Sequence, residues 1–241
     1  MKKLISIIVA FAALSTGLFA QDRELNQIQL SKEGSRIETD LFVAFPMHFG
    51  ASALVNPTYK GLWNTEESLN PHFLDTQLAG NFVYALEMVS LSFRSDASPL
   101  EASIGLGWTF MDFTFKNSRY TFEKVGDYAM PVPIVMSGYD GRKSKYHATY
   151  FDVPLRISYK AGRGRIYAGA SAGILVKGYT KYKHPRVRTT LNDIFNPFRA
   201  TVEAGFGYGV LGFFVNYGLT PLFPETLSDA RTLTFGLTLG M

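Results

Sequence analysis

The most regular alternation of apolar and polar side chains in this sequence lies between Tyr150 and Tyr179. Over residues 151–159 the odd-numbered side chains are all apolar or aromatic, while the even-numbered positions carry Asp, Pro, Arg and Ser. The segment AGRG at 161–164 then reverses the chain, and residues 166–179 alternate again. Successive side chains of a β-strand point to opposite faces, so this period of two predicts a β-hairpin.

The same period predicts six further strands. Together with the hairpin they place strands at residues 37–49, 82–94, 101–110, 151–160, 166–179, 201–208, 213–219 and 232–241. The apolar face changes phase near Met88 and again near Met111, and an extra residue in the strand, a β-bulge, explains the first change. Long connections at 51–80, 117–147, 181–197 and 221–229 alternate with short turns.

An even number of strands joined alternately by long and short connections is typical of outer-membrane barrels, whose long loops are extracellular and whose short turns are periplasmic. A secreted soluble barrel is the alternative, but it would expose the many glycines of the second face, and glycine weakens a strand in water. Charged residues are only 18% of the chain, against roughly 25% in soluble domains. We therefore predict an all-β fold, a single eight-stranded antiparallel transmembrane β-barrel over residues 36–241.

The N-terminus predicts export from the cytoplasm. Residues 1–20 combine Lys2 and Lys3 with an apolar run and a small residue at the end, the pattern of a signal peptide. Residues 21–35 are polar and patternless, and we expect a flexible periplasmic segment there. Beyond the signal no apolar run reaches 18 residues, so a barrel is the predicted way to span the cell outer membrane. The chain has no cysteine, which excludes disulfides and a lipid-anchored cysteine.

Three segments carry a family resemblance: YFDVPLRISYKAG, RIYAGASAGILVKGY and VEAGFGYGVLGFFVNYGLTPLF. With the alternating last strand, they resemble the outer-membrane β-barrel (porin-family) proteins of the Bacteroidetes, over about residues 100–241. The resemblance implies the fold and the outer-membrane location. That family includes a member tied to protein secretion by the type IX system, whereas most members have no assigned activity, so the resemblance implies no specific role for this chain.

Charged residues gather on the face predicted to line the lumen: Glu101, Asp152, Arg156, Lys177 and Glu203. Eight strands leave an interior just wide enough for side chains, and a buried charge is costly unless it is paired. We expect Arg156 to pair with Asp152 along its own strand or with Glu203 across the lumen. Such a network could be an ion path or a structural plug, and the narrow interior favours the plug.

The third long connection is basic, with Lys181, Lys183, Arg186 and Arg188 close together. On the extracellular side these cations would lie beside anionic lipopolysaccharide, so contact with lipid A phosphates is one interpretation and solvated loop charge is the other. The net charge of +4 argues neither for nor against nucleic acid. The partners that we expect are outer-membrane lipid and a protein bound through the extracellular loops, with no nucleic acid and a monomeric barrel.

The histidines give little sign of catalysis. They are scattered at His48, His72, His147 and His184, and His147 near Thr149 is the closest approach of a base to a hydroxyl. We expect neither an enzyme nor a metal or cofactor site. The predicted function is a structural or interaction role at the cell surface, performed by a small porin-family barrel with a side-chain-filled lumen. Membership of a secretion or transport assembly and lipid A modification are the alternatives.

Overall fold

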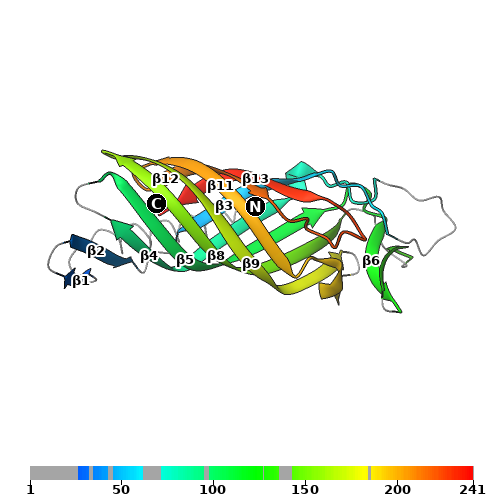
Figure 1. The fold of residues 1–241 in the computed structure, drawn as a ribbon. Helices are drawn as coiled ribbons and strands as arrows, with labels where there is room; N and C mark the ends of the chain where they lie inside the picture. The colour runs from blue at the N-terminus through cyan, green and yellow to red at the C-terminus, as the bar shows by residue number, and fades with distance from the viewer. Residues whose placement is uncertain are drawn as a thin grey trace.

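The computed structural model describes residues 27–32, 35–42, 46–61, 72–94, 98–126, 128–135, 143–183 and 186–240. In this part of the chain one antiparallel sheet closes into an eight-stranded barrel (Figure 1). Its strands are β3 (Met47–Val55), β4 (Phe82–Arg94), β5 (Leu100–Thr114), β8 (Ser144–Ala161), β9 (Gly164–Tyr182), β11 (Phe198–Tyr208), β12 (Leu211–Gly218) and β13 (Arg231–Leu239). Pairing of β3 with both β13 and β4 closes the ring, and the predicted fold is confirmed.

The predicted alternation decides which side chains point outward. Ile157, Ile166 and Phe206 are each at least 60% exposed although they are apolar, whereas polar neighbours such as Asp152 and Ser158 are buried inside. This arrangement is the reverse of a water-soluble core and fits a wall that faces lipid. Among the described residues, no helix is long and apolar enough to cross a membrane.

Glycines make two of the short turns. Gly162 and Gly209 have φ values of +60° and +62°, and each is the first residue of a two-residue turn, between β8 and β9 and between β11 and β12. Tight hairpins need a positive φ at this position, which glycine adopts without strain. Because neighbouring strands are antiparallel and are joined alternately by short and long connections, the short turns lie at one end of the barrel and the long connections at the other.

The structure confirms one predicted phase change and corrects the other. Glu87 pairs with Gly107 and Val89 with Leu106, so Met88 is the extra residue of a β-bulge. Near Met111 no register shift occurs: Met111 and Phe113 stay on the inner face of β5 and are fully buried. The apolar residues change sides there because the interior itself becomes apolar at this level of the barrel.

The start of the chain also differs from the prediction. The strand expected at 37–49 consists of β2 (Ser35–Phe42) and β3, and β3 continues to Val55 inside the expected loop 51–80. Within the segment 21–35, expected to be flexible, β1 (Gln27–Lys32) pairs with β2. The predicted signal peptide, 1–20, lies outside the described residues.

The long connections contain regular structure that the sequence pattern did not predict. The connection between β5 and β8 forms a hairpin of β6 (Tyr120–Val125) and β7 (Tyr128–Pro133). The one between β9 and β11 contains β10 (Val187–Thr190), which pairs with β9, and the short 3-10 helix η2 (Asn192–Ile194). A second 3-10 turn, η1 (Leu78–Gly80), precedes β4. These elements lie at one end of the barrel (Figure 1).

Closure of the barrel depends on the absence of a side chain at Gly236. A Cβ atom there would overlap the carbonyl oxygen of Phe49 and the Cα of Gly50 in the paired strand β3. Gly236→Ala should therefore destabilise the seam, and overpacking of this kind costs about 1 to 3 kcal/mol. The fraction of folded, heat-modifiable protein on an unboiled gel should fall. Gly164→Ala is the matched control, because a Cβ atom there meets only the Ala161 oxygen, at 3.3 Å; equal loss in both variants would contradict this explanation.

Candidate functional site

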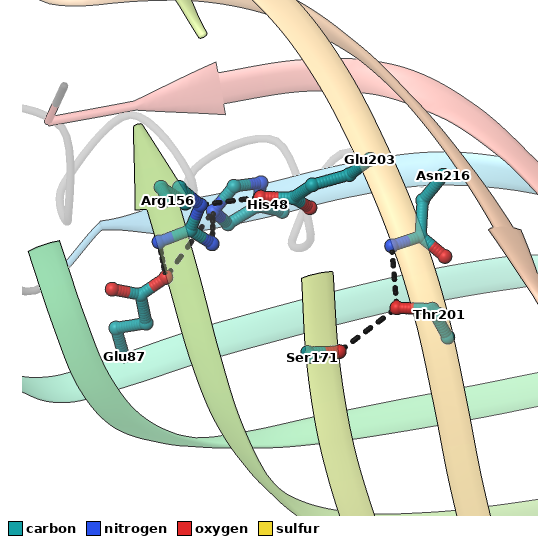
Figure 2. A network of polar contacts seen from close by, with 7 residues as sticks. All are labelled: His48, Glu87, Arg156, Ser171, Thr201, Glu203 and Asn216. Carbon is teal, nitrogen blue, oxygen red and sulfur yellow. Dashed lines mark hydrogen bonds and ion pairs between the residues drawn. The ribbon is translucent and has the colours of Figure 1, made fainter. Parts of the chain in front are cut away.

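A single guanidinium group spans the barrel lumen. Arg156 on β8 donates from Nε to the Glu203 carboxylate on β11 and forms an ion pair through Nη1 with Glu87 on β4 (Figure 2). His48 on β3 lies beside them, with Nε2 3.5 Å from Arg156 Nη2 and 3.9 Å from a Glu87 oxygen. Each carboxylate comes from a strand two positions away from β8 in the sheet. The cluster therefore ties opposite parts of the wall together through the interior.

Further polar pairs occupy the levels above and below this cluster. Toward the short turns, Glu101 forms ion pairs with Lys160 and with Arg165, the latter at 3.5 Å. Toward the long connections, Arg199 Nη1 lies 3.3 Å from an Asp152 oxygen. On the wall between them, the Thr201 hydroxyl bonds to Ser171 at 2.8 Å and to Asn216 at 3.0 Å (Figure 2). Interior charges are thus paired, as a narrow dry lumen requires.

The space left around the Arg156 cluster is small. A cavity of about 50 Å³ is lined there by His48, Glu87, Arg156, Arg199 and Glu203, among others. One water needs about 10 to 15 Å³ when volume is measured this way, so only a few waters fit. A larger space of about 520 Å³ opens at the short-turn end, around Glu101, Lys160 and Arg163. It is a mouth that ends at the filled middle of the barrel.

The other end is closed by an apolar cap. The inner faces of β5 and β8 contribute Phe113 and Tyr146, whose rings stack at 5.2 Å. All four long connections add buried side chains to the same cluster; these are Tyr59, Phe73, Leu74, Phe122, Leu191, Ile194, Phe195, Leu222 and Phe223. This packing is the hydrophobic core of the molecule, and it lies over the outer mouth of the lumen.

Hydrogen bonds and an ion pair join the four long connections in a ring. The backbone N–H of Lys60 donates to Leu227 O at 2.8 Å, that of Lys116 to Asp75 O at 2.7 Å and that of Asn196 to Leu222 O at 2.9 Å. The ion pair between Lys124 and Asp193, at 3.6 Å, closes the ring. Because each connection is held by its neighbours, the cap is one folded unit and not four independent loops.

The structure places the predicted lumen residues as follows. It brings Arg156 and Glu203 together, whereas Asp152 pairs with Arg199 instead of Arg156. Glu101 forms a separate pair near the short turns. Lys177 is not in the lumen: Thr149 pairs with Lys177 and Tyr150 with Leu175, so Val176 is an extra residue that turns Lys177 outward. This bulge in β9, the second in the barrel after that in β4, is the reason why Lys177 was wrongly assigned to the lumen.

Glu87 and Arg199 are among the lumen residues that were not predicted. Glu87 stands between the outward Leu86 and the bulge at Met88, so the phase of β4 already placed it inside. Arg199 precedes the expected start of its strand, but β11 begins at Phe198 and continues the same alternation. Extending the alternation of β11 back to Phe198 would have found Arg199, and the polar face of the predicted strand 82–94 already contained Glu87.

The predicted surface cations fall into two groups. Lys181 and Arg188 lie side by side on β9 and β10, while Lys183 and Arg186 are exposed at the turn between these strands.

Near these cations, His147 Nδ1 lies 2.9 Å from Asp112, and His147 Nε2 lies 2.9 Å from the Thr149 hydroxyl. A base between an acid and a hydroxyl is a catalytic arrangement when a substrate can reach the hydroxyl. Thr149 and His147 are only 7% and 8% exposed, so this trio is better suited to fixing the wall.

No group of three or more His, Asp or Glu side chains in the described residues is placed to hold a metal ion.

A sequence model of the family described as outer membrane protein beta-barrel domain matches residues 88–224, more than half of the chain. The chain belongs to this family. The long connections of this outer-membrane barrel are therefore extracellular and its short turns periplasmic.

Two solved structures are similar to the outer-membrane barrel over most of its length. One is the crystal structure of Neisserial surface protein A, with a TM-score of 0.37 and 9% identity, covering 82% of this chain and 97% of that chain. The other is described as asymmetric conductivity of engineered proteins, with a TM-score of 0.15 and 9% identity, covering 84% and 99%. No curated protein matches the chain.

Removal of Arg156 should destabilise the outer-membrane barrel. Arg156→Ala leaves Glu87 and Glu203 buried on either side of the lumen without their cation, and loss of one partner of a buried pair costs about 3 to 5 kcal/mol. The urea midpoint should fall clearly, and Glu203→Gln added to the same protein should recover part of the loss. Arg165→Ala, near the periplasmic mouth, is the control and should cost less. An unchanged midpoint for Arg156→Ala would show that the cluster is solvated.

Proposed function

We propose that this protein is a sealed outer-membrane barrel that holds a folded cap at the cell surface for contact with a partner there. The observation that carries the proposal is that the interior is closed twice, by the Arg156 cluster in the lumen and by the apolar cap above it. A pore needs a continuous water column, and the filled middle leaves a cavity of about 50 Å³.

A structural or interaction role also accounts for where regular structure is found. A barrel that served only as an anchor would need no folded extracellular part, yet all four long connections contribute to one cap. The β6–β7 hairpin belongs to that cap, with Phe122 buried in it and Glu123 and Lys124 turned to solvent. Its hydrophilic side is the surface that we propose a protein partner contacts. The barrel acts as a monomer in this proposal, and no chemical step is assigned to it.

The sealed interior predicts negligible conductance. Purified protein inserted into a planar bilayer should give no stable unitary steps, because water and ions cannot pass both the Arg156 cluster and the cap. A water-filled porin in the same bilayer serves as the positive control. Stable, reproducible steps from the monomer would decide for a small-solute pore.

Cysteine labelling tests whether the cap is at the cell surface. The natural chain contains no cysteine, so Lys124→Cys in β6 and Arg163→Cys in a short turn each introduce a single thiol. A membrane-impermeant maleimide should label Lys124→Cys in intact cells and Arg163→Cys only after the outer membrane is permeabilised. The reverse pattern would invert the orientation and remove the basis for a surface role.

A further inference from the structure

Three cations stand directly side by side on the outer wall of the barrel. Lys145 on β8 is the cross-strand partner of Lys181 on β9, and Lys181 is the partner of Arg188 on β10. Like charges that face each other across neighbouring strands are destabilising. Lys143 and Lys183 add to the repulsion felt by Lys145. Lys145 Nζ donates to Gly80 O at 3.3 Å, and Asp112 lies 3.5 Å from Lys181. The row therefore carries more positive charge than the one carboxylate beside it can balance.

The row lies on the outer face of the wall and not in the lumen. The register sets Phe110, Thr149 and Lys177 in one cross-strand row, and Asp112, His147 and Tyr179 in the next. Phe110 stacks on the exposed Tyr84 at 4.6 Å, on the outer face of the wall. Lys145, Lys181 and Arg188 follow one row further along the same face, at about 7 Å per row.

Apolar side chains below the cations mark the membrane. The row before Phe110 contains Trp108, Phe151, Ile174 and Phe198, all on the same outer face. Trp108 and Phe151 make an edge-to-face contact at 5.1 Å, and Phe198 is 67% exposed. Aromatic belts of outer-membrane barrels lie at the boundary between the acyl chains and the headgroups. The cations therefore lie at the headgroup level of the outer leaflet.

We define the wall cluster as Asp112, Lys145, Lys177, Tyr179, Lys181 and Arg188. It contains four cations and one carboxylate, and Asp112 is shared by Lys181, at 3.5 Å, and His147. The Arg188 guanidinium carbon lies 3.6 Å from the centre of the Tyr179 ring, and His147 stacks on that ring at 4.5 Å. A guanidinium group placed over a ring face can still donate its N–H groups at the edge to a phosphate.

We propose that the wall cluster is a binding site for the phosphate groups of a phosphorylated glycolipid in the outer leaflet, lipid A being the form tested. Lys145, Lys181 and Arg188 surround the phosphate, and Lys177 meets it from the membrane side. The acyl chains of the same lipid lie along the Trp108 and Phe151 row. Among the basic residues near this end, Lys183 and Arg186 lie at the turn beyond the row and take no part in the site.

Binding of purified lipid A to the refolded protein in a zwitterionic detergent tests the site, with native mass spectrometry as the readout. Bisphosphorylated lipid A should bind, while dephosphorylated lipid A should bind far more weakly. The double variant Lys181→Gln, Arg188→Gln should weaken binding about 30-fold. Each cation contributes about 1 kcal/mol near an anionic lipid surface, which is a factor of about five in affinity, and the two factors multiply. Lys116→Gln with Arg119→Gln removes the same charge from exposed positions between β5 and β6 and should leave the affinity within about twofold of the natural protein.

Asp112→Asn is the variant of opposite sign. It removes the carboxylate that competes for Lys181 and should tighten binding about fivefold, a gain that damage to the fold cannot produce. Heat-modifiable migration confirms that each variant is folded. Equal weakening by the two double variants, or equal binding of dephosphorylated lipid A, would overturn the proposal.

Two further outcomes separate the site from its alternatives. Inorganic phosphate in large excess over the protein should not displace the lipid. Full displacement would show a free-phosphate site and overturn the lipid assignment. The bound lipid A should keep its full mass. Loss of an acyl chain that Thr149→Ala abolishes would show that the wall hydrolyses lipid A. That result would overturn a purely binding site and would also contradict the non-enzymatic role in the proposed function. Failure to bind lipid A would overturn the site but leave the proposed function, a sealed barrel with a folded cap, unaffected.

Discussion

The narrowness of an eight-stranded barrel is the constraint on which the rest of this structure depends. Its interior admits side chains but no column of water, so a charge placed there must find its partner across the lumen. Arg156 does so twice, with Glu87 on one side and Glu203 on the other. These contacts connect strands that do not share a single backbone hydrogen bond. The wall is thus held both around its circumference and through its centre.

The same constraint explains why the interior changes character along its axis. Within the membrane the outer face must be apolar, so the polar residues of each strand fall inside. Beyond the acyl chains the outer face can be polar, and an apolar interior becomes the favourable arrangement. Met111 and Phe113 turn inward at that level, and Asp112 turns outward. The strands keep one register while the two faces exchange their chemistry.

This exchange limits what the sequence could predict. The period of two located seven of the eight barrel strands and only the start of β3, since the strand expected at 37–49 overlaps β2 more than β3. It shows which face is apolar and not which face meets lipid. At Val89, Leu91 and Phe93 the shift of apolar residues reflects a bulge; at Met111 the same signal reflects the apolar cap. The bulge at Val176 left no signal at all, because Leu175 and Val176 are both apolar, and Lys177 was therefore assigned to the wrong side.

The candidate sites divide in the same way. The pair of Arg156 and Glu203 could be predicted, since phase and strand order fix which side chains meet across a narrow lumen. The cap could not, because contacts such as that between Lys60 and Leu227 depend on how four irregular connections fold together. Lys181 and Arg188 were recognised as basic, but the row that they form with Lys145 requires the pairing of β10 with β9, which no apolar alternation marks.

The cap and the wall cluster lie on opposite faces of the same strands. On β8, Tyr146 and Ala148 pack inward into the cap, while Lys145, His147 and Thr149 between them face outward. The spacing of the outer cations is therefore set by the packing of the inner rings. If folding of the cap strengthens ligand binding at the wall, then ligand binding must stabilise the folded cap by the same free energy, because linkage between two sites is reciprocal. Repulsion between Lys145, Lys181 and Arg188 acts in the opposite direction, and the Asp112 carboxylate, 3.5 Å from Lys181, offsets part of it.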